Sequence, residues 1–303
     1  MLHVISHPDY DIILPEGHRF RGGKFTALID YVIRQGFVKD GRISQPRRVD
    51  PELLAKAHDR DYIAAIKDGT LTKDQERVLG LPWSEKLSRR SHLAPEGTYK
   101  TCLKALEHGL ACHAAGGTHH AHYTFGSGFC VFNDMAYAAM RLVDEGNAGK
   151  VLILDVDVHQ GDGTATILSD RSDIYTCSLH CDANYPYEKA VSDRDVILPD
   201  GMEDAAYLKL LAGVLEELAA EVKPDLVIYD AGIDVHKDDV LGRLAMTTEG
   251  VRAREEMVLA FWQKHAVPVA TVIGGGYTKS FDDMIALHGL AFDVAASMMR
   301  KRD

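Results

Sequence analysis

The chain has 303 residues, of which 46% are hydrophobic, and it carries a formal net charge of −11. A chain of this length buries one large core or two modest ones. The acidic balance argues against a nucleic-acid partner. Because the sequence has no apolar run of about 18 residues, we expect no membrane-spanning helix and no membrane partner.

The N-terminal residues and the cysteines indicate a cytoplasmic protein. The stretch MLHVISHPDY lacks the basic start, apolar core and cleavage site of a secretory signal. The five cysteines are odd in number and form no Cys-x-x-Cys motif, which is typical of reduced thiols. We interpret Cys177 and Cys181 as buried small side chains rather than as a redox or metal pair.

Short β-branched runs alternate with helical patterns along the chain. Strands are expected at LHVISH, KVLILDVDV, DIYTCSLH, PDLVIYDAG and VPVATVIGGG. Helices are expected over 135–143 after a cap at Asn133 or Asp134, over 205–222, and over 281–299. Apolar strands separated by helices predict one α/β domain over residues 1–303, with a central, mainly parallel sheet and helices on both faces.

Acidic and histidine side chains gather where the strand expected at 150–158 ends. Asp155, Asp157, His159 and Asp162 fall within one short stretch. If the strand continues to His159, alternate side chains point to one side. Ligands of open parallel sheets bind outside the carboxyl ends of the strands. Since an unpaired carboxylate is costly to bury, we favour a metal or catalytic site over a simple helix cap.

Other predicted strand ends carry the same residue types. The segment DLVIYDAGIDVHKDD contains Asp230, Asp234 and His236, and VATVIGGGY ends in Tyr277. A further segment, GGTHHAHYTFGSGFCVFND, contains the histidine pair His119–His120 between glycines. These side chains are expected to meet the first group at one edge of the sheet.

Asp157, His159 and Asp234 offer one nitrogen and two carboxylate donors to a metal. Three protein ligands and an open position are common in catalytic zinc sites. Oxygen-rich ligation also admits other divalent ions, so Zn²⁺ is the expected ion with Fe²⁺ or Co²⁺ as alternatives.

Four motifs carry a resemblance to a known family. In order, GGTHHA…SGFCVFND, LDVDVHQGDGT, AGIDVHKDDVLGRLAMT and GGGY resemble the blocks of the histone deacetylase family, which has the arginase–deacetylase fold. They cover about half the chain, and HPDYD, HRF and HDRDYI resemble the family's N-terminal part more weakly. The short chain and NYPYEKAVSDRDVILPDG resemble a compact bacterial or class IV-like member.

The resemblance implies a role for each site residue. The implied zinc ligands are Asp157, His159 and Asp234. The implied tandem histidines, with their partner carboxylates, are His119 with Asp155 and His120 with Asp162. His120 is implied as the general base and acid, and Tyr277 as the donor to the amide oxygen.

The resemblance also implies binding sites around this centre. The residues implied for a structural K⁺ are Asp155, Ser178 and Leu179, with main-chain oxygens of Asp157 and His159. The residues implied as walls of an acyl-lysine tunnel are Gly128, Phe129, Tyr185 and Leu241. Arg19 is implied as an arginine deeper in the pocket.

The implied activity is metal-dependent removal of acyl groups from N-acyl-lysine in proteins or peptides. The acyl group, the substrate protein and the oligomeric state are left open. An arginase-like ureohydrolase would need an Asp-x-His-x-Asp strand that DVDVHQGD lacks, and an acetylpolyamine deacetylase would need a narrow acidic entrance. A non-enzymatic scaffold is disfavoured by the intact set of ligands, histidines and tyrosine.

Several histidine and basic residues receive structural interpretations. His113 and His122 are expected to be structural, whereas His180 and His236 stay open between a functional and a hydrogen-bonded structural role. The segment SEKLSRRSH (84–92) is expected to be solvated. At a pocket rim, its Lys86, Arg89 and Arg90 would face an acidic partner.

Overall fold

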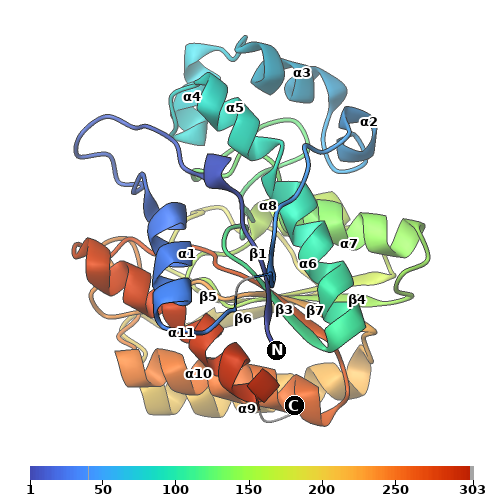
Figure 1. Cartoon of the computed structure of the whole chain (residues 1–303), viewed down its shortest axis with the longest axis vertical. Helices are drawn as coiled ribbons and strands as arrows, with labels where there is room; N and C mark the ends of the chain where they lie inside the picture. The colour runs from blue at the N-terminus through green and yellow to red at the C-terminus, as the bar shows by residue number, and fades with distance from the viewer. Residues whose placement is uncertain (40, 301–303) are drawn as a thin grey trace.

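An eight-stranded, entirely parallel sheet forms the centre of this computed structural model, which describes residues 1–39 and 41–300 (Figure 1). The strand order is β2-β1-β3-β8-β7-β4-β5-β6. The strands are β1 (His3–Ile5), β2 (Ile43–Ser44), β3 (Leu110–His113), β4 (Val151–Asp155), β5 (Ile174–Cys181), β6 (Arg194–Leu198), β7 (Leu226–Asp230) and β8 (Val269–Val272). Parallel pairing with covering helices confirms the predicted α/β class.

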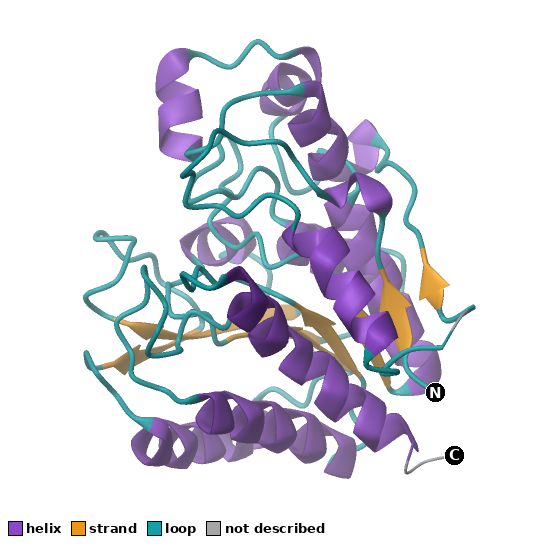
Figure 2. Ribbon diagram, turned by 60° about the vertical axis from the view of Figure 1, so that its left-hand side comes forward, coloured by secondary structure: helices purple, strands orange, loops and turns teal. Residues whose placement is uncertain are grey.

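Helices cover both faces of the sheet (Figure 2). Helices α6, α7 and α8 pack on one face, while α10 and α11 pack on the other and contact α9 and α1. The helical elements are η1 (Pro8–Tyr10), α1 (Lys24–Arg34), α2 (Pro51–Leu54), α3 (Arg60–Asp68), α4 (Lys73–Leu79), α5 (Glu85–Ser91), α6 (Ala94–His108), α7 (Asp134–Asp144), α8 (Asp162–Leu168), α9 (Asp204–Glu221), α10 (Thr248–Lys264) and α11 (Phe281–Arg300). Helices α3 to α5 lie beyond the sheet, at the top of Figure 1.

Five of the eight strands of the sheet were expected from the sequence. The five expected strands correspond to β1, β4, β5, β7 and β8. The strand β4 ends at Asp155 and does not continue through His159, so the metal-ligand candidates after it lie in a loop. The sequence analysis missed β2 and β3, which are two and four residues long, and β6, whose side chains are mostly not buried.

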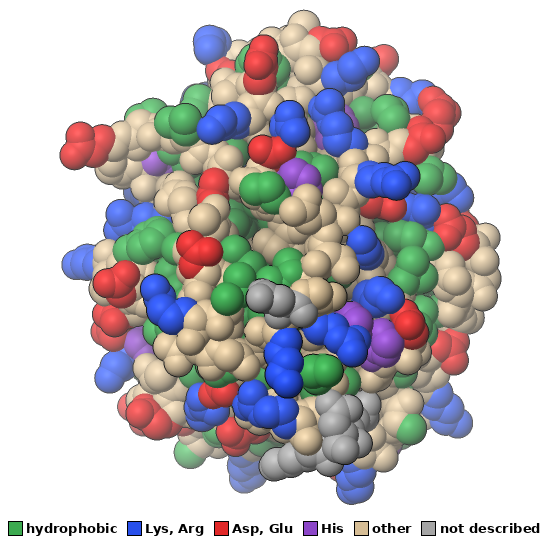
Figure 3. All heavy atoms as spheres, in the orientation of Figure 1, with side chains coloured by type: hydrophobic (Ala, Val, Ile, Leu, Met, Phe, Trp, Pro, Cys, Tyr) green, Lys and Arg blue, Asp and Glu red, His purple; other side chains and the backbone are tan. Residues whose placement is uncertain are grey.

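Two further features are the distribution of charge on the surface and the length and hydropathy of the helices. Basic and acidic side chains are interspersed over the face that Figure 3 shows. Among the described residues, no helix is both long enough and apolar enough to cross a membrane.

Asn133 joins α7 to the loop that follows β3. Its side-chain oxygen accepts a hydrogen bond from the amide of Ala136 (2.9 Å), which caps the helix as expected. Its Nδ2 donates to Thr164 Oγ1 (2.9 Å) and to the carbonyl of Ala121 (3.3 Å). Because Asn133 is fully buried, water does not replace these bonds when the side chain is removed.

We predict that Asn133→Ala lowers the free energy of unfolding by about 2–3 kcal/mol. About 1 kcal/mol comes from the lost cap and the rest from buried groups left without partners. Chemical denaturation measures the change. Thr72→Ala, which removes the cap of the exposed helix α4, is the matched control and should cost about 1 kcal/mol. Equal losses in both variants would mean that the bonds of Asn133 to Ala121 and Thr164 contribute nothing.

Candidate active site

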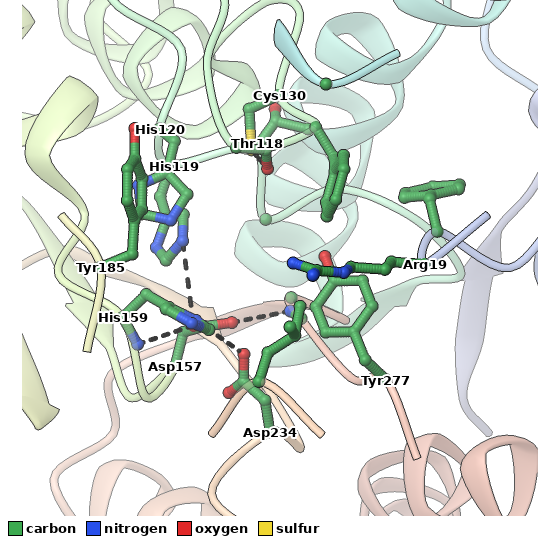
Figure 4. A pocket seen from close by; sticks show the side chains of 18 of the residues that line it. Arg19, Thr118, His119, His120, Cys130, Asp157, His159, Tyr185, Asp234 and Tyr277 are labelled. Carbon is green, nitrogen blue, oxygen red and sulfur yellow. Dashed lines mark hydrogen bonds and ion pairs between the residues drawn. The ribbon is translucent and has the colours of Figure 1, made fainter. Parts of the chain in front are cut away.

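Loops after four neighbouring strands bring the candidate residues together. The strands β3, β8, β7 and β4 are adjacent in the sheet and parallel, so their carboxyl ends share one edge. Figure 4 shows the histidine pair on one side of a cavity, the acidic cluster at its base and Tyr277 on the opposite side. The residues from these loops are His119 and His120 after β3, Asp157 and His159 after β4, Asp234 after β7, and Tyr277 after β8.

The three candidate metal ligands form one tight group. The imidazole Nδ1 of His159 lies 3.0 Å from Oδ1 of Asp157 and 3.1 Å from Oδ2 of Asp234. One donor atom from each residue lies within 4.8 Å of the others, and all three residues are buried. A buried imidazole between two carboxylates fits a divalent cation, because the ion neutralises charges that the protein otherwise leaves close together.

Backbone groups hold the two carboxylates of this group in place. The amide of Gly275 donates to Oδ2 of Asp157 (2.7 Å), and the amide of Val158 donates to Oδ1 of Asp234 (2.9 Å). A Cβ atom at position 275 would lie 2.3 Å from Oδ2 of Asp234. Only glycine therefore allows the loop after β8 to approach this closely.

The pKa values in this group show the competition between a proton and a cation. Burial disfavours the charged imidazole, but hydrogen bonds to Asp157 and Asp234 outweigh it and raise the pKa of His159 to about 10. Burial and then the charge of Asp157 raise the pKa of Asp234 to about 7. A metal ion at this site would have to displace a proton, so its binding would strengthen as the pH rises.

Each of the tandem histidines has its own carboxylate. Nδ1 of His119 lies 2.8 Å from Asp155 Oδ2, and Nδ1 of His120 lies 2.6 Å from Asp162 Oδ1. Both pairs are the ones that the sequence analysis expected. A carboxylate on Nδ1 fixes the tautomer and directs Nε2 of each ring away from its partner acid. A Cβ at Gly128 would lie 2.5 Å from the His120 ring, so this wall also requires glycine.

The environment shifts the pKa values of the two histidines in opposite directions. For His119, burial lowers the pKa, but the charges of Asp155 and Asp157 outweigh it and hold the pKa well above the usual range. For His120, burial and then the positive charge of His119 lower the pKa to about 4. At neutral pH, His119 is therefore the charged ring and His120 the neutral one, which is able to accept a proton.

Asp162 is shared with a third histidine that the sequence analysis had taken as purely structural. Its second oxygen, Oδ2, lies 3.1 Å from Nε2 of His122. Burial opposes ionisation, but hydrogen bonds from His120 and His122 outweigh it and lower the pKa of Asp162 well below its usual range. The spacing of these histidines, two residues apart around one glycine-rich loop, was the only signal for this sharing.

The other histidines considered in the sequence form hydrogen bonds, and the cysteines are buried. His113 interacts with the hydroxyl of Tyr10 (2.7 Å), and His180 interacts with that of Ser178 (3.0 Å). Nε2 of His236 lies 3.2 Å from Oγ1 of Thr248, at the start of α10. All five cysteines are free and buried.

A cavity of about 560 Å³ runs from the surface to the acidic cluster. The hydroxyl of Tyr185 shares a hydrogen bond with Ser127, and its ring lies 4.9 Å from that of His120. Tyr277 faces Phe129 with ring centres 5.8 Å apart. Desolvation by the surrounding protein raises the pKa of the Tyr277 phenol well above its usual range, so it remains a hydrogen-bond donor. The expected wall residues on this cavity are Gly128, Phe129, Tyr185 and Leu241.

Four basic residues line the cavity: Arg19, Lys24, Arg90 and Arg243. Arg19, which the resemblance implied as an arginine deeper in the pocket, is exposed as a whole residue, and its side chain extends into the cavity (Figure 4). The segment 84–92 forms α5 instead of a solvated stretch, and it buries Arg90 against the cavity. A second buried cation, Lys24, was missed. Lys24 and Arg90 both lie on the buried side of a helix. Lys24 comes one turn before the buried Leu28, and this helical spacing was the signal that could have predicted its burial.

Comparison with known proteins identifies the family. An all-parallel sheet with this set of side chains at its carboxyl edge is the architecture expected for a deacetylase. Residues 18–288 match the family model of the histone deacetylase domain, and the chain belongs to the histone deacetylase family. The crystal structure of the HDA15 HD domain superposes with a TM-score of 0.81 at 22% identity, over 98% of this chain and 88% of that one, and shows the same fold.

Three relatives differ in how much is known of them. The chain is 47% identical to an uncharacterized protein of Picosynechococcus sp., over 95% of this chain and 96% of that one. It is 29% identical to Histone deacetylase 2 of Arabidopsis thaliana, over 93% of this chain and 76% of the relative. It is 27% identical to the acetoin utilization protein AcuC of Staphylococcus aureus, over 86% and 72%.

We predict that Asp234→Ala abolishes tight binding of one divalent ion per chain. Loss of one of three ligands leaves a site with too few donors. Elemental analysis of the purified protein and calorimetric titration measure the ion, and titration in buffers of different ionisation enthalpy detects the proton released from His159. Asp230→Asn is the comparison, because Asp230 is buried nearby and belongs, with His119 and Asp155, to a second group of possible ligands; unchanged metal content in it assigns the ion to Asp157, His159 and Asp234. Full metal content in Asp234→Ala would show that the ligand set is wrong.

Proposed function

We propose that this chain is a metal-dependent hydrolase that removes acyl groups from N-acyl-lysine in proteins or peptides. The observation that carries the proposal is that one cavity is lined by the three metal-ligand candidates, by both tandem histidines and by Tyr277. A panel of acyl-lysine peptides and acetylpolyamines, assayed with the metal-reconstituted protein, tests it. Hydrolysis of none of the peptides would overturn it.

The proposed ion is Zn²⁺, held by Asp157, His159 and Asp234, because two carboxylates and an imidazole leave a coordination position open. Fe²⁺ and Co²⁺ suit the same donors. When bound, such an ion polarises the amide carbonyl and lowers the pKa of an attacking water.

The chain's own residues move the protons in this proposal. Nε2 of His120 accepts a proton from the water as its oxygen attacks the amide carbon, while Asp162 stabilises the imidazolium that forms. The Tyr277 hydroxyl donates a hydrogen bond to the developing oxyanion, and the charged His119 ring stabilises it electrostatically. His120 then gives the proton to the leaving nitrogen. The carbon–nitrogen bond breaks, and a carboxylate and a free lysine amine are the products.

The cavity supports an acyl-lysine substrate better than an acetylpolyamine. A polyamine carries several positive charges, which need carboxylates along their path. Among the described residues that line the cavity, the only carboxylates are Asp157 and Asp234, and both belong to the proposed metal site. Val240 and Tyr187 add exposed apolar surface to the lining, which suits the side chains of a peptide.

The proposal also includes a structural K⁺ site, a single domain and a cytoplasmic location. A structural K⁺ at Asp155, Ser178 and Leu179, with main-chain oxygens of Asp157 and His159, is supported by the pairing of Asp155 with Ser178 in adjacent strands. A single domain over 1–303 is supported by the one continuous sheet. A cytoplasmic location agrees with five free cysteines.

We predict that His120→Ala lowers kcat about a hundredfold or more, and that His119→Ala lowers it much less. Only His120 transfers a proton in the proposed reaction, whereas His119 acts through its charge. Steady-state kinetics on the best peptide of the panel measures both, with metal content checked in each variant. Equal activity in the two variants would mean that these roles are assigned wrongly.

We predict that Tyr277→Phe lowers kcat about 100- to 1000-fold, as expected for removal of one oxyanion donor. The ring contact with Phe129 is kept, so KM, metal content and melting temperature should change little. Kinetics, elemental analysis and thermal unfolding measure these quantities. A kcat close to that of the unmodified protein would reduce Tyr277 to a packing residue.

A further inference from the structure

The inner part of the cavity contains two buried cations that lack an acidic partner. Lys24 begins α1 and Arg90 lies near the end of α5, and each residue is only 4% exposed. Within residues 1–39 and 41–300, no carboxylate lies within ion-pair distance of either side chain, and Nε of Arg90 has no hydrogen-bond partner there. Acidic groups act on them only from further away, Asp234 and Asp157 on Lys24 and Asp11 and Asp134 on Arg90. Both residues line the same cavity as the candidate metal ligands.

Aromatic rings hold the two cations in place. The Lys24 ammonium lies 4.9 Å from the ring centre of Phe20 and 5.3 Å from that of Phe25. The Arg90 guanidinium lies 5.4 and 4.6 Å from the same two ring centres. Ring faces attract cations but offer no hydrogen-bond acceptor of the strength of a carboxylate. The Phe20–Phe25 pair therefore positions two charged donors and leaves them able to bind an anion.

Burying these charges without a partner is costly, and an anionic ligand would offset the cost. Burial and then the charge of Arg90 lower the pKa of Lys24 to about 8, so most of the lysine is still charged at neutral pH. Arg19 and Arg243 also line the cavity, whereas its only carboxylates, within the described chain, are those of the proposed metal site. The part of the cavity away from that site is therefore electropositive.

We propose that the enzyme acts preferentially on lysine acyl groups that end in a carboxylate, such as succinyl or glutaryl, with Lys24 and Arg90 binding that distal carboxylate. This inference rests on the proposed deacylase function and names its substrate class. The reaction is the same hydrolysis: the amide carbon–nitrogen bond breaks, the water oxygen bonds to the acyl carbon, and the products are a dicarboxylate and a free lysine amine.

The dimensions agree with a short diacid. The Lys24 ammonium lies 5.8 Å from the ring centre of Tyr277, the residue proposed to hold the scissile carbonyl. In an extended glutaryl group, the distal carboxylate lies about 5 Å beyond the amide carbonyl carbon. An acetyl group ends at its methyl carbon and leaves both cations without a partner.

The test compares charged and uncharged acyl groups of the same shape on one peptide. Succinyl-lysine is paired with succinamoyl-lysine, and glutaryl-lysine with glutaramoyl-lysine, so that only the terminal carboxylate becomes an amide. We expect kcat/KM of the metal-loaded enzyme to favour the charged member about tenfold or more, the effect of one or two charge-assisted hydrogen bonds. Lys24→Met and Arg90→Met should each lower this ratio several-fold, while Lys24→Arg should keep most of it.

Controls make the result independent of folding and of surface charge. The ratio is taken within one preparation, so a partly unfolded variant changes both rates equally. Arg243→Met removes a cation from the exposed part of the cavity lining, where Arg243 is paired with Asp200, and should leave the ratio within about twofold.

Each outcome decides the question. Equal rates on the charged and uncharged members, with peptides still hydrolysed, would overturn this inference and leave the proposed function intact. The same holds if free acetate inhibits the unmodified enzyme but not Lys24→Met while the charged substrates show no advantage, because the cations would then serve the released product. Hydrolysis of no acyl-lysine peptide would overturn the proposed function, and this inference with it.

Discussion

Carboxylates buried side by side at the carboxyl edge of the sheet are the constraint on which the rest of the site depends. Asp155 and Asp230 are the last residues of β4 and β7 and are partners in register. Asp157 and Asp234 follow in the loops. Like charges at this spacing, away from water, repel strongly. The chain folds this way only because protons, histidines, backbone amides and, in the proposed active form, a cation compensate them.

The charge of each carboxylate is compensated by a different group, so the carboxylates have different roles in the site. Burial and then the charge of Asp155 raise the pKa of Asp230 well above its usual range, so Asp230 remains neutral. Asp155 is paired with His119, and Asp157 and Asp234 are left with His159 and with backbone amides. Asp157 and Asp234 are therefore the pair to which the proposed divalent ion would bind. The charges of Asp155 and Asp157 hold the pKa of His119 high, so this ring is protonated. Burial and then the positive charge of His119 lower the pKa of His120, so that ring is neutral.

The sequence predicts those parts of the site that lie next to long buried strands. Asp157 and Asp234 follow apolar runs, and the rule that ligands bind at carboxyl ends of parallel strands brings them together. The length of β4 was less predictable. The strand stops at Asp155, and the residues that follow it form a loop. The pairing of His120 with Asp162 needed the family resemblance, since the two residues lie 42 positions apart in the sequence. The link from Asp162 to His122 was missed, although His122 lies only two residues from His120.

The buried cations were missed because a charged residue is normally assigned to the solvated face of a helix. The helical period contradicts that assignment for Lys24, which shares its stripe with Leu28 and Val32. The helical period does not predict the neighbours of Lys24 in the cavity, because Phe20 lies in the loop before α1 and Arg90 comes from α5.

The separation between these cations and the acidic cluster follows from packing. Salt bridges from Lys24 to Asp157 or Asp234 would satisfy both signs, but they would occupy the oxygens that a metal needs. Instead the ammonium lies against the rings of Phe20, Phe25 and Tyr277. The oxygens of the two carboxylates interact instead with the amides of Gly275 and Val158 and with the imidazole of His159. The aromatic rings thus keep opposite charges apart within one cavity. In the proposed active form, its two regions would bind a metal cation and an anion at the same time.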